Sequence, residues 1–171
     1  MITIAFQKNI HKLDDEELCK VCFKNYKSIN DVTSLHNYND ITMLSCSNLK
    51  LTQLPELPDC LESLYCFKNN LKFLPKLPSQ LIILWCQDNL IETLPELPDK
   101  LDTLWCGRNK ITEIYEIPVS LKVLKCAGNL ITDLPNSDYS NMDINIYNTP
   151  LKKIIDDNYD GNLHSYLQSK Y

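Results

Sequence analysis

The sequence predicts a solenoid in which short parallel strands stack along one face. Three observations lead to this fold class. From Ile41 onward the chain divides into blocks of twenty residues without an insertion. Within each block, apolar residues at the fourth and sixth places alternate with exposed ones, which is the period-two pattern of a strand. The first three return segments carry prolines three residues apart, which keeps them out of a central sheet and favours an extended, polyproline-like backbone.

The period of twenty puts the same residue type at several places of each block, counted from its first residue. The blocks begin at Ile41, Leu61, Leu81, Leu101 and Leu121. The fourth place holds Leu44, Leu64, Leu84, Leu104 and Leu124. A sixth, decayed block keeps the phase through Ile144, Ile146, Leu151 and Ile154. A fixed period of this length indicates a repeat protein in which each coil buries its apolar face against its neighbours.

The block pattern LxxLxCxxNxL resembles the leucine-rich repeat, LxxLxLxxNxL, with cysteine in place of the third leucine. The period of twenty and the tail "LPELP" resemble the short repeats of secreted bacterial effectors of the YopM and IpaH kind. Leucine-rich-repeat proteins of amoebal giant viruses are similar as well. The resemblance covers about residues 41–155. It implies a parallel sheet on a concave face, an extended convex side, and a host protein as a target.

The segments outside the repeats are expected to cap the two ends of the solenoid. Residues 1–40 are predicted to contain a helix near residues 14–26, because Asp14 and Glu17 resemble a capping box. Six repeats are expected over residues 41–155. Residues 156–171 are expected to close the other end, with a helix after Gly161.

Asparagines occupy the ninth place of four blocks, where the chain turns away from the predicted strand. The backbone groups of such a turn lie buried without sheet partners, and an amide can donate and accept at once. We therefore interpret these residues as a structural ladder. They are Asn69, Asn89, Asn109 and Asn129.

The cysteines of the sixth place are predicted to be reduced thiols that fill the core, because a free cysteine behaves as a small apolar residue. Disulfides between in-register strands have poor torsion geometry, and ligands from one wall do not converge on a tetrahedral metal. These residues are Cys46, Cys66, Cys86, Cys106 and Cys126. The pair Cys19 and Cys22 has C-x-x-C spacing, so a metal or redox site stays an alternative to a buried helix face there. No metal or cofactor is expected.

The outward places of the strands contain the candidate binding residues. Aromatic side chains are enriched at binding hot spots, and repeat solenoids bind partners on their concave surfaces. The alternative is that cross-strand aromatic pairs only stabilise the sheet. Charges of alternating sign at the eighth place form either weak ion pairs or a surface that steers a partner. The predicted partner-binding residues are Tyr65, Phe67, Ile83, Trp85, Asp88, Trp105, Arg108 and Lys125.

Charge and motif content narrow the function further. A net charge of −5 argues against nucleic acid and anionic membranes as partners. No leader or apolar span is evident, so a cytoplasmic protein is expected, or one in the host cytoplasm for a viral protein. No catalytic constellation is found. The sequence predicts a non-enzymatic, monomeric module that binds a protein or peptide. Two alternatives are a substrate adaptor for a ubiquitin ligase or other enzyme complex, and a structural, virion-associated component.

Overall fold

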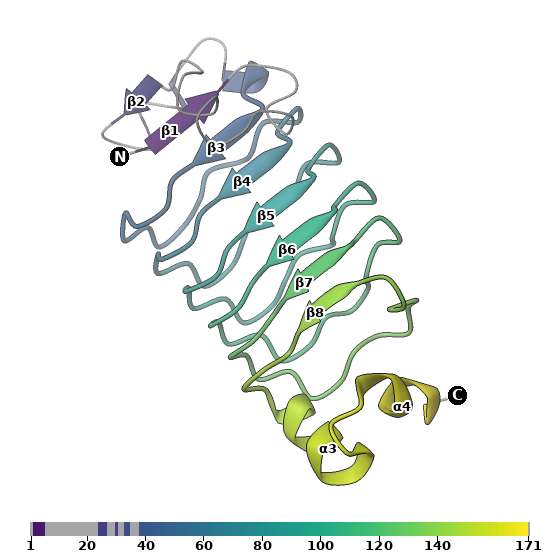
Figure 1. Cartoon of the computed structure of the whole chain (residues 1–171). Coiled ribbons are helices and arrows are strands. Elements are labelled where there is room, and N and C mark those ends of the chain that lie inside the picture. Colours follow the sequence, from purple (N-terminus) through teal and green to yellow (C-terminus); the bar gives the residue numbers. More distant parts are fainter. Residues whose placement is uncertain (1, 6–23, 27–29, 31–32, 35–37, 171) are drawn as a thin grey trace.

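The computed structural model describes residues 2–5, 24–26, 30, 33, 34 and 38–170. They form one row of stacked coils with helices at the C-terminal end (Figure 1). The elements are β1 (Ile2–Ala5), β2 (Lys24–Tyr26), η2 (Tyr38–Asp40), β3 (Met43–Ser45), β4 (Ser63–Tyr65), β5 (Ile83–Trp85), β6 (Thr103–Trp105), β7 (Val123–Lys125), β8 (Asp143–Asn145), α3 (Pro150–Tyr159) and α4 (Leu163–Gln168).

A single sheet runs the length of the molecule, with strand order β2-β1-β3-β4-β5-β6-β7-β8. Strands β3 to β8 are parallel, and each pairs with the next at the same place of the repeat. Leu64, for example, lies between Leu44 and Leu84. This stack confirms the predicted solenoid of parallel strands. We call its outer surface, formed by the outward side chains of the strands, the sheet face.

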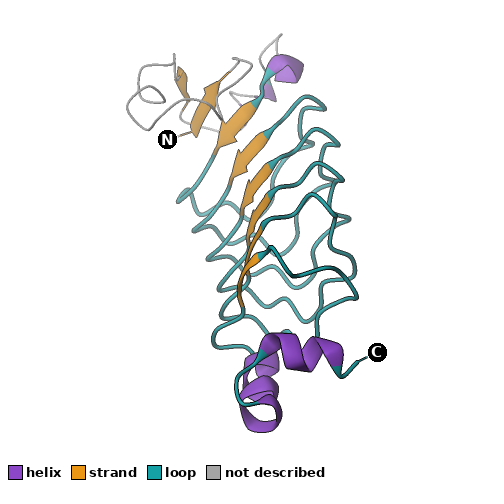
Figure 2. Ribbon diagram, turned by 45° about the vertical axis from the view of Figure 1, so that its right-hand side comes forward, coloured by secondary structure: helices purple, strands orange, loops and turns teal. Residues whose placement is uncertain are grey.

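The core lies behind the sheet, between the strands and the return segments. The leucines of the fourth place and the cysteines of the sixth place are fully buried in the five regular coils. The return segments of these coils contain neither helix nor strand (Figure 2). They are joined by backbone hydrogen bonds between coils, such as Leu90 N–H to the Leu71 carbonyl at 2.9 Å. The extended back of the solenoid is therefore confirmed, and it suits the prolines, which have no N–H to donate.

The sixth-place cysteines are free thiols packed between coils. Burial raises the pKa of Cys46 and Cys126 to about 12. Burial, together with the neighbouring thiols of the column, raises the pKa of Cys86 and Cys106 well above the ordinary range. The thiolate is the reactive form, so these sulfurs are chemically inert at neutral pH and act as apolar filler.

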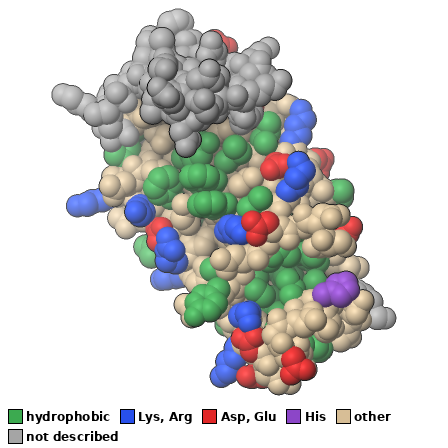
Figure 3. All heavy atoms as spheres, in the orientation of Figure 1, with side chains coloured by type: hydrophobic (Ala, Val, Ile, Leu, Met, Phe, Trp, Pro, Cys, Tyr) green, Lys and Arg blue, Asp and Glu red, His purple; other side chains and the backbone are tan. Residues whose placement is uncertain are grey.

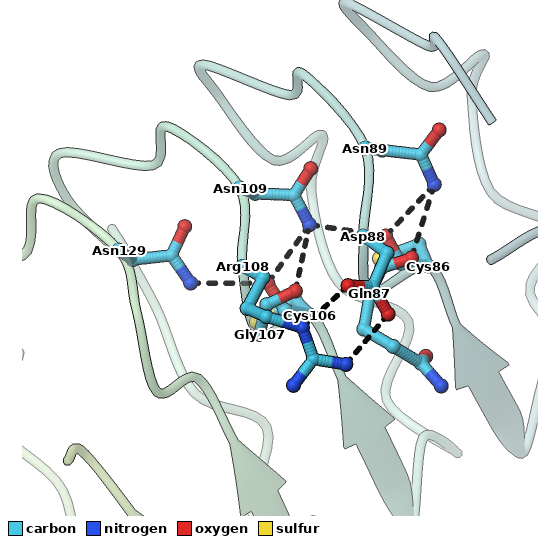
Figure 4. A network of polar contacts seen from close by, with 9 residues as sticks. All are labelled: Cys86, Gln87, Asp88, Asn89, Cys106, Gly107, Arg108, Asn109 and Asn129. Carbon is cyan, nitrogen blue, oxygen red and sulfur yellow. Dashed lines mark hydrogen bonds and ion pairs between the residues drawn. The ribbon is translucent and has the colours of Figure 1, made fainter. Parts of the chain in front are cut away.

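Each ninth-place asparagine links its coil to the preceding one (Figure 4). The Asn109 amide donates to the carbonyls of Cys86 and Cys106, at 3.0 and 2.9 Å. Its oxygen accepts from the N–H of Ile91 at 3.0 Å. Asn69, Asn89 and Asn129 repeat this pattern. One side chain thus satisfies three buried backbone groups that the sheet cannot reach.

The direction of this link explains the two blocks that lack the asparagine. The first coil has no preceding repeat to bind, so Leu49 takes the ninth place, and its N–H donates to Asn69 at 2.9 Å. In the last block Thr149 caps a helix instead. Its hydroxyl accepts from Lys152 N–H at 3.1 Å and donates to the Ile146 carbonyl at 2.7 Å.

The N-terminal end differs from the predicted helical cap. Lys24–Tyr26, expected at the end of a helix over residues 14–26, form strand β2. Strand β2 pairs antiparallel with β1, and β1 pairs antiparallel with β3. An open edge of backbone donors and acceptors can be paired by further strands, which explains why Lys24–Tyr26 are extended. Residues 14–23, with Cys19 and Cys22, lie outside the described residues.

The C-terminal end is closed by helices that begin earlier than expected. Helix α4 follows Gly161 as predicted, but α3 starts at Pro150 and replaces the return segment of the sixth repeat. As a result Ile155 is buried, whereas Ile154, which keeps the phase of the repeat, is 38% exposed. Helix α4 is held to the preceding coil by Asp133, which accepts from the Tyr166 hydroxyl and the Lys170 ammonium.

Replacement of Asn109 by alanine should destabilise the fold strongly, because three buried backbone groups lose their partner. We expect the free energy of unfolding to fall by about 3 kcal/mol or more, measured by urea denaturation followed by circular dichroism. The exposed Asn70, which follows the ladder residue Asn69, provides the control: Asn70→Ala should change this free energy by less than about 0.5 kcal/mol. Equal losses in the two variants would contradict the structural role of the amide.

The thiol column predicts a stability that declines at alkaline pH. The folded thiols keep their protons above the ordinary thiol pKa of 9.0, whereas unfolded thiols lose them, so stability is full below pH 9.0 and falls towards pH 12. In Cys106→Ala the slope of unfolding free energy against pH in this window should be shallower by about 1.4 kcal/mol per pH unit. The control Ile111→Val should lower stability without changing the slope. An unchanged slope in Cys106→Ala would show that its thiol titrates normally.

Candidate functional site

The predicted aromatic residues lie side by side on the sheet face because their strands pair in register. Tyr65 is opposite Trp85 in the ladder, and Trp85 is opposite Trp105. All three side chains are half-buried, as are Phe67 and Ile83. Hydrophobic side chains accordingly gather on the upper half of this face (Figure 3). We call Tyr65, Phe67, Trp85 and Trp105 the aromatic stripe.

The rings of the aromatic stripe are in direct contact. Trp85 and Trp105 stack with centroids 4.4 Å apart and planes within 8° of parallel. Tyr65 meets Trp85 edge-on at 5.1 Å and 87°, and Phe67 lies 6.5 Å from Trp85 at 51°. Such pairs contribute about 0.5–1.5 kcal/mol each beyond the area they bury. The stripe therefore stabilises the sheet, and this contribution is compatible with binding.

Several polar atoms of the sheet face are covered without being paired. The indole N–H groups of Trp85 and Trp105 and the amide oxygen of Gln87 are out of reach of water. None of them has a hydrogen-bond partner among the described residues. A covered donor or acceptor without a partner costs about 1–3 kcal/mol. Trp85, Trp105 and Gln87 thus hold hydrogen-bonding capacity that the described residues leave unused.

The charged residues at the eighth place lie along one edge of the sheet face. The Arg108 guanidinium donates two parallel hydrogen bonds to the Asp88 carboxylate (Figure 4). The bond from its terminal nitrogen measures 2.6 Å. The hydrogen bond from Arg108 holds the pKa of Asp88 below its usual range. The guanidinium is nevertheless 68% exposed, so water screens the pair and it adds little stability. The predicted ion pair is present, while Lys68 is exposed and forms none with a described residue.

The backbone at this edge restricts which residues fit. Each coil turns there through a left-handed conformation, with φ of 54° at Lys68, 57° at Asp88, 51° at Arg108 and 69° at Gly128. Left-handed backbone favours glycine and asparagine and costs other residues about 1–2 kcal/mol. Lys68 and Arg108 occupy this position despite that cost.

Two ion pairs were not predicted from the sequence. Lys125, predicted as a partner-binding residue, is paired with Asp143 of the next strand. Lys122 is paired with Asp102 of the preceding coil at 2.5 Å. Both pairs join residues about one repeat apart in the sequence, so the repeat period could have predicted them. Gln87, at the seventh place beside the aromatic stripe, is a further candidate binding residue.

Within the described ranges, no group of three histidine, cysteine or acidic side chains is arranged to hold a metal ion. His11 and His36, the histidines nearest the C-x-x-C pair in sequence, lie outside those ranges together with Cys19 and Cys22.

None of the described helices combines the length and the apolar character that a membrane span requires.

Solved structures show where this architecture occurs. The leucine-rich-repeat domain of a Shigella effector is 38% identical, with a TM-score of 0.62 over 65% of this chain and 50% of that one. The fold is that of a leucine-rich-repeat solenoid. YopM from Yersinia enterocolitica WA-314 is 28% identical, with a TM-score of 0.51 over 58% of this chain and 27% of YopM. No protein-family model and no curated protein matches the chain.

These matches confirm the predicted resemblance to repeats of the YopM and IpaH kind. Both proteins are bacterial, so the resemblance to giant-virus proteins stays a prediction. The leucine-rich-repeat solenoid spans half of the Shigella domain and about a quarter of YopM. The matches therefore establish the repeat architecture and leave the binding residues to be argued from this chain.

The stacked indoles predict a spectroscopic signature in solution. The chain has two tryptophans, and each indole lies over the other at 4.4 Å, so ring currents should shift their ring-proton NMR signals upfield. We expect Trp85→Leu to return the Trp105 signals to ordinary positions, and Trp105→Leu to do the same for Trp85. Phe67→Leu, which removes a neighbouring ring, should keep the Trp105 signals upfield. Upfield Trp105 signals that survive Trp85→Leu would contradict the stacked arrangement.

Proposed function

We propose that the leucine-rich-repeat solenoid is a non-enzymatic module that binds a protein or peptide on its sheet face. The observation that carries this proposal is the aromatic stripe, whose covered indole N–H groups have no hydrogen-bond partner among the described residues. Contiguous aromatic surface is typical of interfaces, and tryptophan and tyrosine are enriched among the residues that dominate binding energy. The unpaired N–H groups add a reason for a partner with hydrogen-bond acceptors.

The mode of binding follows from the ring stack. Because the indole N–H groups are covered, a partner can reach them only after the side chains around Trp85 and Trp105 move. The cost of that movement is offset when peptide carbonyls accept from the released N–H groups. Binding should therefore be selective for an extended segment whose backbone lies across the strands, with apolar side chains against Tyr65 and Ile83.

The charged residues at the eighth place are expected to orient a bound partner more than to strengthen its binding. Arg108 and Lys68 are exposed beside the stripe, and exposed charges chiefly affect the rate of encounter and the choice of partner. The similar Shigella protein is described as an effector, which supports a host protein as the partner class. A host-cell cytoplasm is the corresponding location in this proposal.

The experiment compares three baits made from the full chain: wild type, Trp85→Ala/Trp105→Ala, and Phe73→Ala/Leu130→Ala. The last pair removes two exposed apolar side chains that lie outside the strands and controls for the loss of apolar surface. Proteins captured from a eukaryotic cell lysate by wild type and the control, but not by the tryptophan variant, are then purified. We expect the tryptophan variant to bind them at least about 30-fold more weakly in calorimetry, since one hot-spot residue contributes 2 kcal/mol or more.

Circular dichroism and thermal midpoints must show that each bait is folded. Full binding by the folded tryptophan variant would refute the sheet face as the binding surface. A partner that needs residues 1–40 in place of the stripe would instead favour the substrate-adaptor alternative.

A further inference from the structure

A groove crosses the back of the solenoid, on the return segments of three neighbouring coils. It has a volume of about 570 Å³. Its floor is formed by the seventeenth-place leucines, of which Leu77 is buried and Leu57 and Leu97 are half-buried. Its walls are the prolines on either side of them, Pro75, Pro78, Pro95 and Pro98. We call this feature the back groove.

The back groove continues onto a fourth coil. A second hollow of about 200 Å³ shares Pro95, Glu96 and Leu97 with it. Tyr115, whose side chain is 68% exposed, lines this far end. Four coils spaced like neighbouring strands cover about 14 Å, which an extended segment of four or five residues would span.

Acceptors predominate among the polar side chains of the back groove. The wall prolines have no N–H to donate, and the carbonyls of Pro78 and Pro98 already accept from the N–H groups of Leu81 and Leu101, at 3.1 and 2.9 Å. The rim carboxylates are acceptors, whereas Lys76 and Ser79 are lining side chains that can donate. A ligand that supplies donors therefore suits the rim.

The charge of the rim also favours a ligand that supplies hydrogen-bond donors. Five carboxylates and one ammonium line the two hollows, and none of them forms an ion pair with a described residue. The acids are Glu56, Asp59, Glu96, Asp99 and Glu116, and the cation is Lys76. Elsewhere on the solenoid Asp102 and Asp143 are each paired with a lysine. The local excess of five carboxylates over one ammonium favours a positively charged ligand.

We propose that the back groove binds a short, extended, basic segment of a partner protein. Aliphatic side chains of the segment rest on Leu57, Leu77 and Leu97. Its lysine or arginine side chains donate to the rim carboxylates. This surface is separate from the aromatic stripe, which lies on the strands, so its test does not depend on the function proposed for the sheet face.

The proposal is tested with the full chain, labelled with nitrogen-15, and an acetylated peptide that alternates arginine and leucine. In an extended peptide the leucines share one side and the arginines the other. The amide signals of Leu77 and Leu97 should shift saturably, with a Kd below about 1 mM. The indole signals of Trp85 and Trp105 report on the sheet face and should stay in place. A peptide with glutamate in place of arginine should cause no shift.

Two matched variants separate the groove from overall charge. Glu96→Gln/Asp99→Asn removes two exposed rim carboxylates and should weaken binding about fivefold. Glu92→Gln/Asp157→Asn makes the same change in net charge at exposed positions outside the back groove and should leave the affinity unchanged. Equal weakening in both variants, binding of the glutamate peptide, shifts confined to the indole signals, or the absence of saturable shifts would each overturn the proposal.

Discussion

The buried asparagine amide that ties each coil to the one before it is the constraint on which the solenoid depends. A three-residue strand pairs only a small part of each coil, so the turn that follows buries backbone groups outside the ladder. At Asn89 one amide serves the carbonyls of Cys66 and Cys86 and the N–H of Leu71. Because the donors and the acceptor act at once, the amide sets both the spacing and the register of neighbouring coils.

That register produces the two surfaces of the molecule. In-register strands place Trp105 directly beside Trp85, and the ring separation of 4.4 Å is close to the strand spacing of about 4.8 Å. The same repetition aligns the prolines and leucines of the back groove. The two surfaces differ in chemistry, because the sheet face covers indole donors that no described residue pairs, whereas the rim of the back groove carries acceptors. The two proposed sites would therefore suit partners of different character.

The ends of the solenoid show what a coil does when one neighbour is missing. At the N-terminal side the free edge of β3 is paired by β1, because backbone donors and acceptors in a row need another strand. At the C-terminal side the last asparagine of the ladder is Asn129, and the next coil ends in helix α3. Thr149 supplies the helix cap and Pro150 begins the helix, so the same position that carries a ladder amide elsewhere ends the repeat here.

The sequence by itself determined the coil, the inward places and the asparagine ladder, because each follows from a local period and from the need to pair buried backbone. The helix after Gly161 is equally local. Tertiary structure alone decided that Lys125 is held by Asp143, that the indole N–H groups are covered, and that residues 24–26 form a strand. These features depend on side-chain orientation and on neighbours distant along the chain, which a repeat pattern does not specify.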